Sequence, residues 1–449
     1  MTLFDELDAR ADAHVDLLCD LIGRPSRTGH LDEVRACADH LVGFLADRGW
    51  RAEAAPVDDL APVVFAELPA PPGRPTLLLY SHYDVISPEP VAEWTHPPFA
   101  ATRVAGRIIG RGSTDAKANL LALILAADAL RATGGLPCGL QLMVDGDEER
   151  GSPGLPGFMD AYAGRLTADA ALSFDGSIDP SGVPKLGLGT SGMVYVELSC
   201  QGANAELHSA LQRLFVNPAW RLLWALASVK GPDERVLIPG FADDIVPPDE
   251  RDRELMAAMP WDDQRQLAGT GLTGFLTGVQ GAAAVERLLF QPGVTLCGFH
   301  AGYAGEGPKA IIPDRATAKL EFRIVPDQRP ERVLDQLRGH LDAQGFADVE
   351  IRPLAMVETA KTDPDAAIVR STAAAARALY GEPMLKPTEE YAGRQGAWLG
   401  RRLGIPGVQT GIGPPGARAH ATDEFVTEEH FLTGIKFAGE ILRRYGESA

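Results

Sequence analysis

The segment that decides the fold is Pro75-Thr-Leu-Leu-Leu-Tyr80, which is followed directly by Ser81-His-Tyr-Asp84. A short apolar run of this length, bounded by polar residues, is typical of a strand buried on both faces of a sheet. Two further runs, 140–144 and 168–174, have the same character, and the Leu- and Ala-rich stretch 116–132 predicts a helix between the first two. Strands that alternate with helices imply right-handed crossovers. We therefore expect an α/β fold with a mixed, mostly parallel central sheet flanked by helices.

A different pattern begins near residue 190. Residues 193–201 and 316–325 alternate apolar and polar residues as half-buried strands do, and a helical stretch follows each of them. The α/β rhythm resumes towards the C-terminus. The sequence therefore predicts one domain made of residues 1–189 and 356–449, interrupted by an inserted α+β domain at 190–355.

The composition is that of a globular chain with enough length for two domains. The sequence has 449 residues, of which 45% are apolar, and a domain usually takes about 100–200 residues. With 42 Lys and Arg against 61 Asp and Glu, the formal net charge is −19. A field of this sign repels phosphate groups, so we expect neither nucleic acid nor an anionic membrane surface as a partner.

The features that bear on location favour the cytoplasm. No apolar run in the sequence approaches the roughly 18 residues that cross a bilayer, and the acidic stretch 1–8 fits neither a secretory signal nor a transit peptide. The five cysteines lie far apart and show no CxxC spacing, so we expect reduced thiols.

Acidic residues and a histidine follow the predicted strands where each strand ends. His82 and Asp84 come after the first strand, Glu148 and Glu149 follow the second, and Asp175 ends the third. The carboxyl ends of parallel strands form the ligand-binding edge of an open α/β sheet. Two residues apart on extended chain, a histidine and an aspartate point to the same side. The carboxylate can then hold one imidazole nitrogen while the other nitrogen binds a metal ion.

Taken singly, each of these residues has an ordinary structural interpretation. A histidine at a strand end is often hydrogen-bonded within the fold, an aspartate after a strand often caps a helix, and a Glu-Glu pair fits a solvated surface. The set is larger, however, because Asp115 precedes the long helix and His420 follows a glycine-rich loop. Several carboxylates at one edge repel one another unless cations neutralise them. Two divalent ions would do so, and His with Asp or Glu is a donor set suited to zinc or a similar ion.

The order and spacing of five blocks resemble those of one enzyme family. The blocks are His82-Tyr-Asp-Val85, Gly110-Arg-Gly-Ser-Thr-Asp-Ala-Lys117, Asp145-Gly-Asp-Glu-Glu-Arg-Gly-Ser152, Asp175 and His420. They are similar to the blocks of the co-catalytic zinc peptidases, a family that includes carnosinase and cytosolic dipeptidase, carboxypeptidase G, aminoacylase, acetylornithine deacetylase and succinyl-diaminopimelate desuccinylase. The resemblance covers nearly the whole chain and implies that residues 1–189 and 356–449 are the catalytic domain.

The resemblance implies a site for two divalent metal ions, zinc first, with manganese or cobalt as alternatives. Asp115 would bridge the ions, His82 and Asp175 would complete one site, and Glu149 and His420 would complete the other. Two metals about 3.5–4 Å apart can hold a bridging hydroxide and polarise the scissile carbonyl.

Two further residues of the same blocks are implied to act in catalysis. Glu148 would be the general base that takes the water proton and passes it to the leaving amine, and Asp84 would orient His82.

The insert at 190–355 is implied to be the lid or dimerisation domain of a homodimer. His208 would reach the active site, in several family members from the other subunit, and stabilise the oxyanion. Arg323 would contact a substrate carboxylate, and Asn217 and Arg394 are further substrate-binding candidates. The ordinary alternatives are a surface histidine, an outward arginine on a strand, and an asparagine that caps a helix.

Departures from the family pattern leave the substrate class open. Ala118 stands where carnosinase-like members usually carry glycine, Trp398 lies in a loop where small residues are common, and the segment after His420 is closer to the deacylase branch. The leading hypothesis is a two-metal dipeptidase or carboxypeptidase-type peptidase. The alternative is an N-acyl-amino-acid deacylase with the same machinery. A lapsed enzyme that only binds metal and a biosynthetic amide-forming enzyme are further hypotheses, and retention of all five ligands weighs against the lapsed enzyme.

Overall fold

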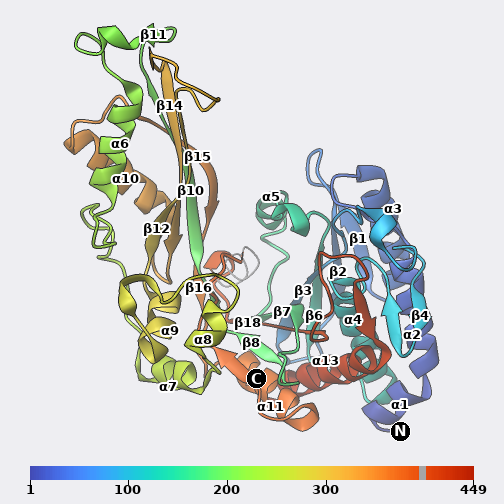
Figure 1. The fold of residues 1–449 in the computed structure, drawn as a ribbon. Coiled ribbons are helices and arrows are strands. Elements are labelled where there is room, and N and C mark those ends of the chain that lie inside the picture. Colours follow the sequence, from blue (N-terminus) through green and yellow to red (C-terminus); the bar gives the residue numbers. More distant parts are fainter. Residues whose placement is uncertain (394–400, 449) are drawn as a thin grey trace. The chain divides into compact units, whose positions relative to one another are not determined.

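The described chain, residues 1–393 and 401–448 of a computed structural model, forms two structural units. Figure 1 shows both of them coloured along the sequence. Unit 1 comprises Met1–Leu188, Thr362–Pro387 and residues 401–448, and unit 2 comprises Gly189–Lys361 and Thr388–Gly393. Unit 2 therefore interrupts the sequence of unit 1.

Unit 1 is built on an eight-stranded mixed sheet with the order β1-β2-β6-β3-β7-β18-β8-β17. Its strands are β1 (Arg51–Ala55), β2 (Val63–Leu68), β3 (Thr76–His82), β6 (Gly139–Asp145), β7 (Ala170–Ser177), β8 (Lys185–Gly187), β17 (Met384–Lys386) and β18 (Gly407–Gly413). The central strands β6, β3, β7 and β18 run parallel to one another. Antiparallel pairs join β1 to β2, β2 to β6, and β18 to β8. The predicted α/β fold with a mixed, mostly parallel central sheet is confirmed.

The apolar run 75–80 forms most of β3, and every residue from Leu77 to His82 is buried. Leu78 and Tyr80 belong to a core cluster that also contains Phe158 of helix α5 (Leu155–Ala161). Helix α4 (Lys117–Thr133) also lies against β3, β7 and β18. Burial of the whole run explains why these residues are continuously apolar, without the alternation of a strand that has one wet face.

The remaining helices of unit 1 cover the sheet and its edges (Figure 1). They are α1 (Leu3–Ala9), α2 (Ala11–Ile22), α3 (Leu31–Ala46), α11 (Ala367–Leu379) and α13 (Glu428–Ser448), with short 3₁₀ turns η1 (Val91–Glu93) and η2 (Glu148–Arg150). A small sheet of β4 (Thr102–Val104), β5 (Arg107–Ile109) and β19 (Phe425–Thr427) completes the unit. Helix α4 packs against both α13 and the sheet and is buried on nearly all sides, which explains its Leu- and Ala-rich composition.

Unit 2 contains a four-stranded antiparallel sheet with the order β12-β14-β10-β15. Its strands are β10 (Gly192–Gln201), β12 (Gly293–Ala301), β14 (Arg315–Ile324) and β15 (Glu350–Val357). Helices α6 (Pro218–Val229) and α10 (Pro330–Ala343) contribute to one core with β10 and β14. The smaller elements are β9 (Gly189–Thr190), β11 (Leu207–His208), η3 (Ser209–Leu211), α7 (Glu250–Ala258), α8 (Asp263–Leu267), η4 (Leu276–Gly278), α9 (Gly281–Phe290), β13 (Ile311–Ile312) and β16 (Ala360–Lys361).

Among the described helices, none combines the length and the apolar character that a bilayer crossing needs.

Candidate metal centre

Five side chains of unit 1 form two groups that share the carboxylate of Asp115. One group is His82, Asp115 and Asp175, and the other is Asp115, Glu149 and His420; the candidate ligand atoms within each group all lie within 4.8 Å of one another. His82 ends β3, Asp175 lies in β7, and Glu149 lies in η2, which follows β6. Three neighbouring strands therefore deliver three of the five residues to one edge of the sheet.

Asp115 presents one oxygen to each imidazole. Its Oδ1 lies 3.0 Å from Nε2 of His82, and its Oδ2 lies 3.1 Å from Nε2 of His420. The His82 Nε2 atom is also 3.4 Å from Oδ1 of Asp175, and the His420 Nε2 atom is 3.0 Å from Oε2 of Glu149. The two groups thus lie on opposite oxygens of a single carboxylate.

Asp84 is fully buried beneath this cluster and contacts two of its segments. Its Oδ1 lies 3.3 Å from Nδ1 of His82, on the side of the ring away from Asp115. The same carboxylate accepts hydrogen bonds from the main-chain N–H groups of Glu148 at 3.1 Å and Glu149 at 3.3 Å, and from Oγ1 of Thr28 at 2.8 Å. Nδ1 of His82 also lies 3.1 Å from the main-chain carbonyl oxygen of Asp84. One residue, through its carbonyl and its side chain, therefore positions both the ring of His82 and the turn that carries Glu149.

The electrostatics of the cluster favour bound positive charge. Burial raises the pKa of Asp175 and Glu149 above their ordinary values. Hydrogen bonds to Asp115 and Glu149 raise the pKa of His420 to about 10. Burial alone would lower the pKa of His82, but Asp175 and Asp115 outweigh it and raise that pKa well above its ordinary value. Carboxylates that crowd together in this way are stabilised by cations.

The donor set fits a pair of divalent metal ions. Two imidazole nitrogens and three carboxylates, without a thiolate, are ligands used by zinc and by similar first-row ions. Each group would supply three protein ligands to an ion, which would leave coordination positions for water or substrate, as in catalytic metal sites.

Glu148 lines a cleft of about 580 Å³ together with Asp115, Asp175 and His420. It is adjacent to Glu149 in sequence but belongs to neither ligand group. Burial, supported by Asp175 and Glu149, raises its pKa to about 8 although His82 opposes the shift.

Three functional candidates were not predicted from the sequence. Thr28 donates a hydrogen bond to the carboxylate of Asp84, and Glu424 accepts one from the main-chain N–H of Asp115. Both bonds join distant parts of the chain. Arg418 lines the cleft with Glu148, is exposed, and places Nη2 3.3 Å from Oγ1 of Thr422. Its position two residues before His420 is the one sequence feature that points to it.

The predicted residues of unit 2 have the following surroundings. His208 is exposed at the end of β11, and its Nδ1 accepts a hydrogen bond from the Ala210 N–H at 3.1 Å. Asn217 caps α6, with Oδ1 accepting from the Ala219 N–H at 2.9 Å. Arg323 lies on β14 and pairs with Glu321.

Arg323 also lines a second cleft, of about 590 Å³, with Trp261 and Phe275. Arg394 lies outside the described residues.

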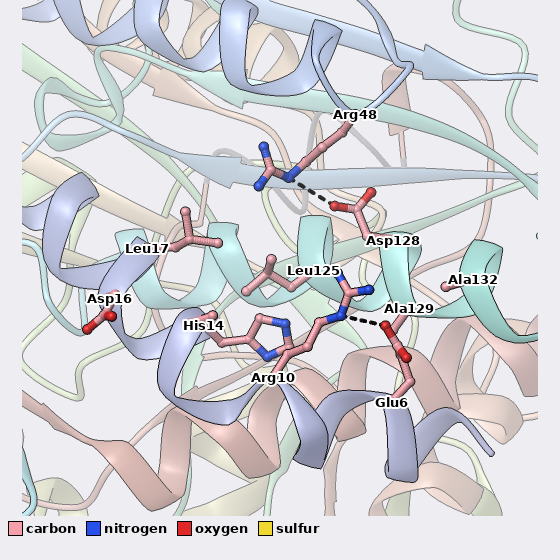
Figure 2. A pocket seen from close by; sticks show the side chains of 11 residues that line it. Glu6, Arg10, His14, Asp16, Leu17, Arg48, Leu125, Asp128, Ala129 and Ala132 are labelled. Atoms are coloured by element: carbon pink, nitrogen blue, oxygen red, sulfur yellow. Dashed lines mark ion pairs between the residues drawn. The ribbon is translucent and has the colours of Figure 1, made fainter. Parts of the chain in front are cut away.

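Another cavity, of about 480 Å³, lies between α1, α2 and α4 in unit 1 (Figure 2). Two ion pairs line it, Arg10 with Glu6 at 2.6 Å and Arg48 with Asp128 at 3.0 Å. None of the predicted site residues is among its lining residues, and four of its charged side chains form these two pairs. This cavity is therefore separate from the metal-ligand cluster.

Comparisons of the sequence and of the structure with known proteins point to the same group of peptidases. The model of peptidase family M20/M25/M40 matches residues 78–444. The Cys-Gly metallodipeptidase dug1 of Schizosaccharomyces pombe is 25% identical over 358 residues, which cover 76% of this chain and 75% of that protein. The human Beta-Ala-His dipeptidase is 28% identical over 289 residues, which cover 63% of this chain and 56% of that protein.

Among solved structures, the M20 family metallo-carboxypeptidase Sso-CP2 from Sulfolobus solfataricus is similar over almost the whole chain. It has a TM-score of 0.85 and 31% identity, with 97% of this chain and 99% of that chain covered.

Proposed function

The chain belongs to peptidase family M20/M25/M40 and is a metal-dependent hydrolase of peptide bonds. We propose which residues of its site hold the metal ions and which carry out the hydrolysis. The observation that carries the proposal is the Asp115 carboxylate, which faces an imidazole with each oxygen and completes two ligand groups at once. The proposed substrates are dipeptides, or short peptides that are cleaved before their C-terminal residue, as the names of the relatives indicate for those proteins.

In this proposal His82 and Asp175 would hold one divalent ion, Glu149 and His420 would hold the other, and Asp115 would contribute to both groups. Zinc is the first choice because the donor set suits it, and manganese and cobalt are alternatives. The chemistry that two such ions would supply when bound is activation of a water molecule and polarisation of the scissile carbonyl. Asp84 keeps the Nδ1 edge of His82 occupied, so Nε2 faces Asp115 and Asp175.

Glu148 is the proposed general base. It lines the cleft next to Asp115 and Asp175 without belonging to a ligand group. Its carboxylate takes the proton of the attacking water and returns it to the leaving amine. A general base works best when its pKa is near the operating pH, and the buried surroundings of Glu148 raise its pKa towards that range.

Unit 2 is proposed to be the lid and dimerisation domain. His208 would stabilise the oxyanion, and Arg323, with Arg394 as a further candidate, would bind the substrate carboxylate, as the family resemblance implies. Asn217 is a weaker candidate for substrate binding, because its side chain already caps α6.

An exposed apolar patch supports the proposed homodimer. Trp220 and Trp224 of α6 are each 57% exposed, with ring centres 6.1 Å apart, and Leu214 and Val216 just before the helix are exposed as well. A cluster of large apolar side chains on a surface is typical of an interface with another protein. We assign this patch, residues 214–224, to contact with a second copy of the chain.

The test of the proposed function is a substrate panel measured with zinc, manganese and cobalt. Cys-Gly and β-Ala-His represent the dipeptides, a tripeptide series reports carboxypeptidase action, and N-acetyl amino acids represent the deacylase alternative. We expect hydrolysis of dipeptides, with kcat/KM for N-acetyl amino acids lower by at least an order of magnitude. Hydrolysis of the N-acetyl amino acids alone would replace the peptidase assignment by the deacylase.

A further inference from the structure

We infer that Glu424, paired with Arg111, is a positioning residue that holds the Asp115 and His420 loops together, so that the His420 group can bind its ion. The inference rests on the proposed two-metal site and adds a residue to it that makes no contact with an ion. The bond pattern around Glu424 carries it.

The Glu424 carboxylate is fully buried and serves the loop that ends in Asp115. Its Oε1 accepts hydrogen bonds from the main-chain N–H groups of Thr114 at 2.9 Å and Asp115 at 3.1 Å. Its Oε2 accepts from the Gly112 N–H at 3.0 Å and from Nη1 of Arg111 at 2.7 Å. Four donors from one five-residue segment therefore converge on a single side chain.

Arg111 makes the return contact to the His420 loop. The residue is buried, and its Nη2 donates to the carbonyl oxygen of Ala421, the residue after His420, at 3.1 Å. The Gly110 N–H also donates to the Glu424 carbonyl at 2.9 Å. Each loop thus bonds the other through both side chain and main chain, and we call these contacts the 111–424 clasp.

The two ligand groups differ in what else holds them. His82 and Asp175 lie on β3 and β7, which are hydrogen-bonded neighbours in the sheet. His420 lies in the loop between β18 and β19, and it has a positive φ of 63°, as does Arg418 with 61°. Such conformations cost energy in residues other than glycine and persist only where surrounding contacts impose them. The clasp contacts the loops of two members of the His420 group, Asp115 and His420. In the His82 group it reaches only the shared Asp115, because His82 and Asp175 are held by the sheet.

This asymmetry predicts which ion depends on the clasp. Glu424→Gln keeps the side-chain volume but replaces one acceptor oxygen by an amide NH₂ group. This group would face N–H donors that it cannot accept from, and the ion pair with Arg111 would be lost. Groups behind the ligands typically change metal affinity by about 10–100-fold when they are replaced. We therefore expect one ion to bind Glu424→Gln about 10–100-fold more weakly than the wild type and the other ion to be affected far less.

The experiment is a calorimetric titration of the metal-free full-length chain with Co²⁺, with the visible absorption of bound cobalt recorded in parallel. The wild type should take up two ions. The titration and spectrum of Glu424→Gln should resemble those of His420→Ala and differ from those of His82→Ala. Arg111→Lys keeps the positive charge but loses the forked guanidinium that reaches both Glu424 and Ala421. It should therefore show the same selective loss of one ion. This variant tests the inference if Glu424→Gln does not fold.

Glu440→Gln is the matched control. Glu440 is also a buried carboxylate of unit 1, and it pairs with Arg443 and Arg444 within α13. Its replacement should lower the melting temperature while both ions bind as in the wild type.

Two outcomes would overturn the role of the clasp: two ions bound to both clasp variants with wild-type affinities, or equal weakening of the two ions. If the wild type itself took up fewer than two ions, the proposed two-metal function would fail together with the inference.

Discussion

Asp115 joins the two candidate ligand groups, because each oxygen of its carboxylate faces one imidazole. All five candidate ligands could be named from the sequence, because each follows a strand or lies in a block with a recognisable spacing. Glu424 and Thr28 could not, because their importance comes from contacts that span 309 and 56 residues of sequence. Such contacts exist only once the loops have been brought together by the fold, and no local pattern records them.

Glu148 gives the first prediction at this scale. Glu148→Gln keeps the volume of the side chain but cannot accept the proton of the attacking water, so kcat should fall by about 10²–10⁴-fold. Elemental analysis should still find two metal ions per chain, because Glu148 belongs to neither ligand group. Glu149→Gln is the comparison, and it should lose metal. An unchanged kcat in Glu148→Gln would remove this residue from the mechanism.

Arg418 gives the second prediction at the scale of single residues. Among the described residues that line the cleft, it is the side chain with a permanent positive charge. Charge-assisted hydrogen bonds of an arginine contribute about 1.5–3 kcal/mol, so Arg418→Ala should raise KM for dipeptides with an acidic side chain about tenfold or more. Neutral dipeptides should be affected less. Arg24→Ala, which removes an arginine paired with Asp20 on α2, is the control, and equal effects on both substrate types would argue against a selective contact.

At the scale of elements, the central strands and long helices could be predicted, but strand β18 could not. Its sequence, Gly407-Val-Gln-Thr-Gly-Ile-Gly413, has the glycine content of a loop. The structure explains this composition, because a Cβ on Gly411 would lie only 2.2 Å from the main chain of Gly176 in β7. Close approach of two backbones therefore excludes larger residues. Edge strand β12 was missed for another reason, since most of its side chains are not buried and show no clear alternation.

Helix α2 gives a prediction about pH. His14 on this helix is 6% exposed, and burial, reinforced by Arg10, lowers its pKa below the ordinary 6.5. The unfolded chain therefore binds this proton more readily than the folded one. The contribution of His14 to stability is fully present above pH 6.5 and is lost as the pH falls.

We expect His14→Gln to lose less stability than the wild type between pH 7 and pH 5.5. Urea unfolding at both pH values, with chelator present throughout, measures the difference. His300→Gln, at an exposed histidine of β12, should leave the wild-type dependence unchanged. The same loss of stability in His14→Gln as in the wild type would show that His14 does not contribute to it.

At the scale of the whole molecule, the change of sequence pattern near residue 190 coincides with the start of unit 2 at Gly189. The return to unit 1 is harder to predict, because Thr388–Gly393 also belongs to unit 2. This short segment is held by main-chain contacts such as the hydrogen bond from the Ser191 N–H to the Glu389 carbonyl at 3.0 Å. Periodicity cannot detect a segment of six residues that lies beside a partner distant in sequence.

The apolar patch at 214–224 gives the prediction at this scale. If it is the contact between two copies, the double variant Trp220→Glu with Trp224→Glu should be monomeric where the wild type is dimeric. Light scattering after gel filtration at several concentrations measures the mass. Leu272→Glu changes a leucine that is 67% exposed outside the patch and should leave the mass unchanged. A double variant that remained dimeric would place the interface elsewhere.

The wide spacing of the ligands along the chain has a consequence for biosynthesis. His82, Asp115, Glu149 and Asp175 lie within the first 175 residues, whereas His420 follows only after the entire insertion has been translated. On the proposed ligand assignment, a nascent polypeptide contains every residue of the first group once Asp175 has been translated, but it lacks one residue of the second group until His420 has been added. Hydrolysis that needs both ions would then begin only after His420 has been translated.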